Sequence, residues 1–213
     1  MSLRCCARVL VPSTASSTEA SLHPGLGAWH NECVKLGASS IVVLAWILSA
    51  GCGGSDVDES VPDVAFCDPV TGWDAEWTAI ENDVLALVNQ ARSVGHNCDS
   101  EGNFGPASAL TMNPALRCAA RVHSLDMQER DFFAHTNPSN EGPSDRVESA
   151  GYLWRRVGEN IAVGYGSAES VMEGWLDSDG HCSNLMNPGY TEIGVGYYPT
   201  DGPYWTQAFG TPR

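Results

Sequence analysis

Three short blocks decide the fold of this chain: FFAHTNP at residues 132–138, VGENIAVG at 157–164 and WLDSDGHCSNLMNPGYTEIGVGY at 175–197. Each block places one titratable side chain, His135, Glu159 or His181, among small neighbours rich in Gly and Asn. Only the third block lies near a run of Asp, so a general cluster of charges does not explain the pattern. We therefore treat these three side chains as the candidates for a functional site.

Hydrophobic spacing before and between the blocks predicts helices. Apolar residues recur at three- and four-residue steps over 77–91, which indicates a helix with one buried stripe. A second helix is expected to begin at Asn113-Pro114, where a cap is followed by a first-turn proline, and to end near Arg130. Shorter helices are expected over 145–150 and from Ser167 to Trp175. The stripe of the first helix consists of Trp77, Ile80, Val84, Leu87 and Ala91.

After Pro188 the spacing of apolar residues changes to a period of two, which is typical of strands. Two such runs, one around Val195 and one around Thr206, are separated by turn residues at 200–203, so a hairpin is expected. The block GENIAVG is expected to supply a further short strand. Helices combined with a small antiparallel sheet indicate the α+β class.

In this order and at these separations, the three blocks resemble the CAP superfamily of cysteine-rich secretory, antigen 5 and pathogenesis-related proteins, in its bacterial SCP-like extracellular form. The resemblance covers roughly Trp77 to Gly210, which is nearly all of the predicted folded part. It implies a three-layer α-β-α sandwich, with a small three-stranded antiparallel sheet between helices.

The resemblance also implies a cleft lined by two His and two acidic residues. His135 matches the first His, Glu159 the first acid and His181 the second His, whereas Ser178 stands where the second acid is expected. Two neutral imidazoles and a carboxylate can bind a divalent metal such as Zn²⁺, which makes His135, Glu159 and His181 the candidate metal ligands. The alternative is a hydrogen-bonded polar network that shapes the cleft.

Other polar residues are expected to be structural. His123 shares an apolar helix face with Leu116 and Met127, so we expect it to be a core histidine whose polar atoms are hydrogen-bonded. Arg146, Arg155 and Arg156 are expected to pair with nearby acids on a solvated face.

Four cysteines fall in the predicted domain and its tether, and an even number in an exported chain indicates two disulfides with three possible connectivities. Bacterial members of the resembled family often carry only the cysteines that match Cys98 and Cys182, which implies that these two pair. Cys67 and Cys118 are then left for each other.

The first quarter of the chain is typical of an export signal. Residues 1–33 are of mixed composition, and we expect a start site placed too early. Residues 34–51 contain a positive charge, an apolar run and LSAGC at 48–52, which indicate a lipoprotein signal peptide with lipidation at Cys52. Residues 52–72 are expected to be an acidic tether, and 73–211 the folded domain.

The charge of the mature chain limits its partners. From Cys52 onward, 8 Arg and no Lys stand against 24 Asp and Glu, a net charge of −16. Such a surface repels phosphate backbones and anionic headgroups, so nucleic acid is excluded as a partner and the membrane is reached only through the lipid anchor.

We expect a binding module rather than an enzyme, exported and held at the cell envelope, on the outer membrane or cell surface, with secretion as the alternative. The resemblance implies a small hydrophobic or lipid ligand, or a protein partner in the envelope. Two alternatives stay open: a metal-assisted, protease-like hydrolase that uses His135, Glu159 and His181, with Zn as its possible cofactor, and a structural envelope domain with a vestigial cleft.

Overall fold

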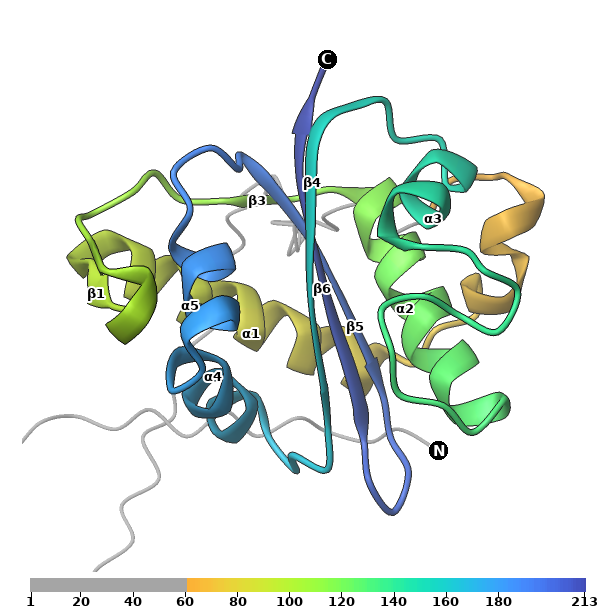
Figure 1. Ribbon diagram of the computed structural model, residues 1–213. Coiled ribbons are helices and arrows are strands. Elements are labelled where there is room, and N and C mark those ends of the chain that lie inside the picture. The colour runs from red at the N-terminus through yellow and green to blue at the C-terminus, as the bar shows by residue number, and fades with distance from the viewer. Residues whose placement is uncertain (1–60) are drawn as a thin grey trace, which may run out of the picture. The chain divides into compact units, whose positions relative to one another are not determined.

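The computed structural model describes residues 61–213, so the expected start site, signal peptide and lipidated Cys52 lie outside the described residues. The described part is an α+β domain in three layers, as the sequence predicts (Figure 1). Its helices are α1 (Ala75–Val94), α2 (Pro114–Glu129), α3 (Pro143–Ser149), α4 (Ala168–Leu176) and α5 (Asp179–Met186), with 3-10 helices η1 (Ala65–Val70) and η2 (Asp99–Glu101).

The middle layer is a sheet whose strand order is β3-β5-β6-β4. Its long strands β4 (Trp154–Val163), β5 (Glu192–Tyr198) and β6 (Tyr204–Pro212) pair antiparallel, and the two-residue β3 (Thr111–Met112) adds a parallel edge to β5. β4 is the other edge strand. A separate two-stranded ribbon joins β1 (His96–Asn97) to β2 (Asn103–Phe104).

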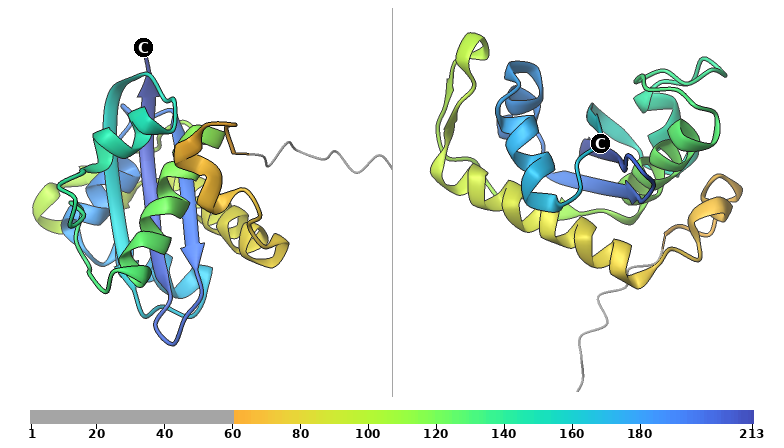
Figure 2. Two further views of the ribbon diagram at one scale, coloured as in Figure 1. Left: turned by 90° about the vertical axis from the view of Figure 1, so that its right-hand side faces the viewer. Right: turned by 90° about the horizontal axis from the view of Figure 1, so that it is seen from below.

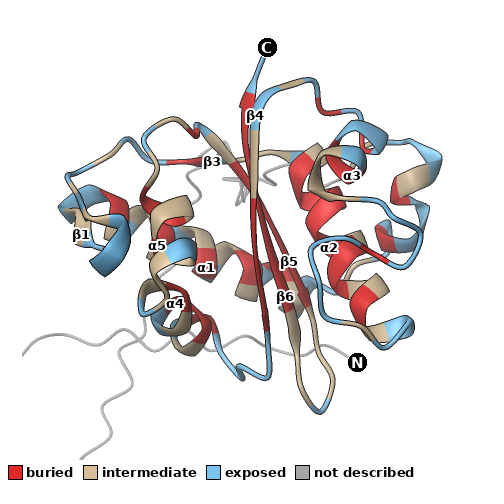
Figure 3. Cartoon of the chain, in the orientation of Figure 1, coloured by how far each residue is buried: buried red, intermediate tan, exposed pale blue. Residues whose placement is uncertain are grey.

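Helices cover both faces of the sheet. α2 and α3 lie on one side, and α4 and α5 on the other, with the long α1 running behind the strands in the view of Figure 1 (Figures 1 and 2). β5 and β6 are buried along most of their length, whereas β4 is buried mainly in its second half, over residues 159–162 (Figure 3). Trp175 on α4 and Trp205 on β6 are almost fully buried in the core between the sheet and α1, α4 and α5. None of the helices within residues 61–213 is long and apolar enough to span a membrane.

α2 packs unusually close to β5 because glycines alternate along that strand. A Cβ atom at Gly194 would overlap the backbone of Leu116 and Arg117, and one at Gly196 would overlap the backbone of Ala120. Side chains on the same strand that point the other way, such as Val195, fill the opposite core. The GVG pattern thus lets the helix backbone approach the strand directly.

Asp74 caps α1, and its carboxylate accepts a hydrogen bond from the backbone N–H of Glu76. The line of buried residues along α1 is shifted by one residue from the predicted stripe. The fully buried positions are Glu81, Val84, Val88 and Arg92, all at 0% exposure. The predicted Leu87 and Ala91 are only partly buried. The spacing of apolar residues could not predict this line, because two of its four members, Glu81 and Arg92, are charged. Their interaction partners lie far away in the sequence.

Those remote partners are backbone and side-chain groups on other elements. Arg92 donates to the carbonyls of Ser108, Leu185, Asn187 and Tyr190, so it holds the end of α5 against α1. Glu81 accepts from Arg121 on α2 at 2.6 Å. A charge buried without such partners would destabilise the domain by several kcal/mol.

Two disulfides cross-link the domain, and their pairing is the one that the resemblance implies. Cys98–Cys182 joins the loop after α1 to α5, and Cys67–Cys118 joins η1 to α2. The sequence separations of 84 and 51 residues are long, and closing loops of this length stabilises a fold by about 4 kcal/mol each in the chain-entropy model.

The structure also differs from the sequence-based expectations in where ordered elements begin and lie. Residues 65–70, assigned to the tether, form η1, in which Cys67 and Val70 are buried against α2, so ordered structure begins before residue 73. Residues 179–186, for which no helix was expected, form α5, and His181 lies on it. Its short GHCSN sequence lacks an apolar period long enough to reveal a helix.

Candidate functional site

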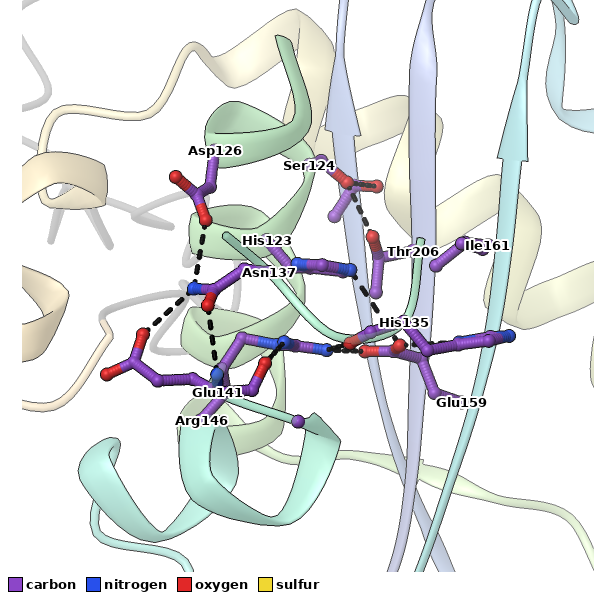
Figure 4. A network of polar contacts seen from close by, with 12 residues as sticks. His123, Ser124, Asp126, His135, Asn137, Glu141, Arg146, Glu159, Ile161 and Thr206 are labelled. Atoms are coloured by element: carbon purple, nitrogen blue, oxygen red, sulfur yellow. Dashed lines mark hydrogen bonds and ion pairs between the residues drawn. The ribbon is translucent and has the colours of Figure 1, made fainter. Parts of the chain in front are cut away.

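The structure brings the first two candidate residues together from separate elements. His135 lies in the segment between α2 and α3, and Glu159 lies on β4. The Nδ1 atom of His135 is 2.8 Å from Oε1 of Glu159 (Figure 4). The carboxylate is almost completely buried, whereas the imidazole is half exposed.

Asn137 shapes the segment that carries His135. Its side-chain oxygen accepts from the backbone N–H of Ser139 and of Glu141, which closes a tight turn. Its side-chain nitrogen donates to the carboxylates of Asp126 on α2 and Glu141 (Figure 4). The segment is thus tied back to α2 two residues after His135.

Arg146 forms a hydrogen-bonded ion pair with the other carboxylate oxygen of Glu159. Its Nη2 lies 2.7 Å from Oε2 of Glu159 and also donates to the backbone carbonyl of His135 (Figure 4). Arg146 comes from α3 and is buried, contrary to the expected solvated face. Within residues 61–213, Arg155 and Arg156 form no ion pair with an acid.

The ionisation of Glu159 follows from these contacts. Burial raises its pKa, but the hydrogen bond with His135 and the charge of Arg146 outweigh burial and hold the pKa below its usual range. Glu159 is therefore a carboxylate at neutral pH, with both oxygens engaged by protein groups.

His123 on α2 is a third histidine at this carboxylate. Its Nε2 lies 3.8 Å from Oε1 of Glu159, too far for a hydrogen bond. The ring is fully buried, and neither of its nitrogens has a hydrogen-bond partner among the described residues. Burial lowers its pKa from 6.5 to about 4, although the charge of Glu159 partly opposes this shift. His123 is a core residue as expected, but its ring nitrogens lack the hydrogen bonds that were expected.

His181 reaches the site from the opposite side of β4. Asn160, next to Glu159, donates to the backbone carbonyl of His181, and Asn184 donates to the backbone carbonyl of Glu159. The neighbouring Cys182 is fixed by its disulfide. Burial, and then the nearby charge of His135, lower the pKa of His181. The two imidazoles therefore lie within electrostatic range of each other across the edge of β4.

The fourth position of the expected cleft carries no acid. Ser178 is the residue that precedes the first turn of α5, and its side chain makes no capping hydrogen bond. Of its two acidic neighbours, Asp179 accepts from the backbone and the hydroxyl of Ser100 on η2. That carboxylate is directed to the ribbon loop and does not replace the missing acid.

The residues present do not fit the metal site that was expected. Within residues 61–213, no group of three or more His, Cys, Asp or Glu side chains is arranged to hold a metal ion. Glu159 is engaged by His135 and by a guanidinium whose positive charge opposes a cation. This arrangement corresponds to the alternative of a hydrogen-bonded polar network.

Among the hollows of residues 61–213, two have a mainly apolar lining. The first, of about 220 Å³, follows the free edge of β4 and is lined by Phe133, Ile161, Ala162, Val163, Tyr165, Gly174, Trp175 and His181. The second, of about 380 Å³, lies between α1 and α4 and is lined by Leu87, Gln90, Ala91, Val94, His96, Glu169, Met172, Glu173 and Leu176. We call the second one the α1–α4 groove.

The α1–α4 groove is mainly apolar and open to solvent. Val94, at the end of α1, is 74% exposed beside it, whereas Met172 on α4 forms part of its buried floor. Sequence reasoning missed this groove, together with Arg146 and His123 as contacts of Glu159. The sequence feature that could have indicated the groove is the apolar stripe of α1, because part of that stripe is left uncovered by the core.

The comparisons with known proteins agree with the fold described above. The sequence model of the cysteine-rich secretory protein family, CAP, matches residues 85–209. Among curated proteins, the uncharacterized protein YkwD of Bacillus subtilis is 40% identical over 132 residues, 62% of this chain and 47% of that protein. The uncharacterized membrane protein YlbC of the same organism is 40% identical over 137 residues, 64% of this chain and 36% of that protein. The chain thus matches less than half of the length of either relative.

Solved structures are similar as well. An extracellular protein of Bacillus anthracis that contains an SCP domain superposes with a TM-score of 0.54 and 28% identity, over 62% of this chain and 40% of that one. An outer surface protein of Borrelia burgdorferi has a TM-score of 0.52 and 19% identity, over 65% of this chain and 95% of that one. The second likeness concerns the fold alone.

Proposed function

The chain belongs to the cysteine-rich secretory protein (CAP) family, and from that premise we propose that its domain is an exported binding module that holds one small apolar ligand in the α1–α4 groove. The observation that carries the proposal is the groove itself. Its volume of about 380 Å³ is within the ~300–1,000 Å³ range of small-molecule sites, and its lining is mainly apolar with a few polar groups at the rim.

The groove also accounts for apolar surface that the core leaves open. Leu87 and Ala91 belong to the apolar stripe of α1 but are only partly buried, and Val94 extends the same line to the end of the helix. Burying each methylene of a ligand against such surface contributes about 0.8 kcal/mol. A single alkyl chain is therefore the simplest ligand for this shape.

Export is supported by chemistry and by similarity. Two disulfides persist only in an oxidising compartment in most organisms, and the SCP-domain protein of Bacillus anthracis, 28% identical, is described as extracellular. The LSAGC sequence at 48–52 supports a lipid anchor on Cys52. We propose an envelope lipoprotein on these grounds.

Calorimetric titration with decanol tests the ligand proposal. The full chain should carry Cys52→Ser, so that no acyl anchor is attached and no detergent is needed. Decanol should bind with a stoichiometry of one. Ala91→Trp should weaken that binding by at least about tenfold, because the indole excludes two or more methylenes worth about 0.8 kcal/mol each.

The matched control is Ala79→Trp, an exposed position on the same helix about two turns before Leu87, the first residue of the groove. It should leave decanol binding unchanged. Equal binding by the Ala91→Trp and unsubstituted chains would show that the groove is not the site. No binding of decanol by any of the three chains would refute the binding-module proposal.

A further inference from the structure

The polar groups at the α1–α4 groove are acidic or neutral. Glu169 and Glu173 line it from α4, and Gln90 and His96 line it from the α1 side. No Lys or Arg is among the lining residues, and residues 61–213 contain no Lys at all. At neutral pH the two carboxylates give the rim a negative charge.

Glu169 is held in its charged form by local contacts. It lies in the first turn of α4, where its own backbone N–H and then the Ser167 hydroxyl hydrogen-bond the carboxylate and lower its pKa. This carboxylate already satisfies the positive end of the helix. A ligand carboxylate could not use the same helix end without displacing Glu169.

The arginines of the domain do not offset this rim charge. Four of the eight in residues 61–213, Arg92, Arg117, Arg121 and Arg146, are buried. Of the exposed ones, Arg130 is bonded through two nitrogens to Asp126 on α2, across the sheet from the groove. The surface is therefore more negative than the sequence count indicates.

We propose that the α1–α4 groove selects single-chain amphiphiles whose headgroup carries a positive charge, with the alkyl chain against Leu87, Ala91 and Met172 and the headgroup between Glu169 and Glu173. The inference rests on the proposed function and adds the class of ligand. Opposite charge at the rim favours an alkylammonium, and like charge opposes a fatty acid. A neutral alcohol with the same chain length should bind with an affinity between those of the alkylammonium and the fatty acid.

Three probes with the same ten-carbon chain separate the contribution of the headgroup from that of the chain: decyltrimethylammonium, decanol and decanoate. Each is titrated below its micellar concentration into the full chain carrying Cys52→Ser, at pH 7.5. At low salt, decyltrimethylammonium should bind on the order of tenfold more tightly than decanoate, because each exposed carboxylate contributes a few-fold. The difference should shrink in 1 M salt, where the Debye length is about 3 Å.

The variant Glu169→Gln/Glu173→Gln should lose the preference for the cation and keep the affinity for decanol, which also shows that the variant is folded. The control Glu76→Gln/Glu129→Gln makes the same change in net charge at exposed positions on α1 and α2 that do not line the groove. It should keep most of the preference.

Each result has one meaning. Decanoate binding as tightly as decyltrimethylammonium, or a preference that survives in Glu169→Gln/Glu173→Gln, would overturn the headgroup assignment while leaving the proposed function intact. Failure of all three probes to bind would overturn the proposed function, and the headgroup assignment with it.

Discussion

At the scale of single residues, Glu159 organises the cleft. Its two oxygens are held by His135 and Arg146, and His123 stands behind it without a hydrogen bond. A buried carboxylate with a buried guanidinium partner is a stable structural unit only while both members are present. The polar network therefore connects α2, α3 and β4 around one negative charge.

His123 should make the stability of the domain depend on pH. Its folded pKa of about 4 lies below the ordinary 6.5, so between these values the unfolded chain binds a proton that the folded chain does not. The free energy of unfolding should then fall as pH falls below about 6.5 and level off below about 4. The total loss from this residue is roughly 3 kcal/mol.

Urea denaturation of the His123→Leu variant between pH 7 and 4 measures this. Its free energy of unfolding should depend on pH less steeply than that of the unsubstituted chain, by about 1.4 kcal/mol per pH unit in that window. Met127→Leu, at a fully buried position one turn later on α2, is the control and should keep the original slope. Parallel curves for His123→Leu and the unsubstituted chain would refute the buried-neutral assignment.

At the scale of elements, the contact of α2 with β5 depends on glycine. Gly194→Ala adds one methyl group that overlaps the backbone of Leu116 and Arg117, and a backbone cannot rotate away as a side chain can. The helix must move off the sheet, so we expect destabilisation of about 3 kcal/mol or more, at the upper end of overpacking costs. Thermal unfolding followed by circular dichroism measures it.

Gly202→Ala is the matched control, because it lies in the turn between β5 and β6 and an added Cβ would meet nothing within 4 Å. It should change the free energy of unfolding by no more than about 0.5 kcal/mol. If the two substitutions had equal effects, the close approach of α2 to β5 would not be a source of specificity for this fold.

At the scale of the whole molecule, the proposed envelope lipoprotein would have to stay near a membrane whose anionic lipids repel its acidic domain. From Cys52 onward the chain carries a net charge of −16, and half of its arginines are buried. Attachment through Cys52 would hold the domain there despite this repulsion if Cys52 carries more than one acyl chain, because a single chain gives only marginal anchoring.

Detergent-phase partitioning of cell extracts tests the anchor. The unsubstituted protein should enter the detergent phase, and Cys52→Ser should move it to the aqueous phase. Cys33→Ser, which lies before the apolar run, should leave the partitioning unchanged. An unsubstituted protein whose intact mass shows no lipid would contradict the anchor.

Local features of the sequence were enough to predict most of the elements. The three- and four-residue spacing in α1 and α2, the period of two in β5 and β6, and the cap residue Asn113 all act within a few residues of the chain. The three short blocks predicted the family and its layers. The disulfide pairing required the resemblance, because four cysteines alone allow three connectivities.

What only the tertiary structure decided is which remote groups meet. No local pattern places Arg146 on Glu159, leaves His123 unbonded behind it, or buries Glu81 and Arg92 in the line where α1 contacts its neighbours. The groove likewise exists because α4 covers only part of the apolar face of α1. The sequence by itself determined most of the elements and the family, since spacing and caps are local. The charge partners and the groove depend instead on how distant elements pack.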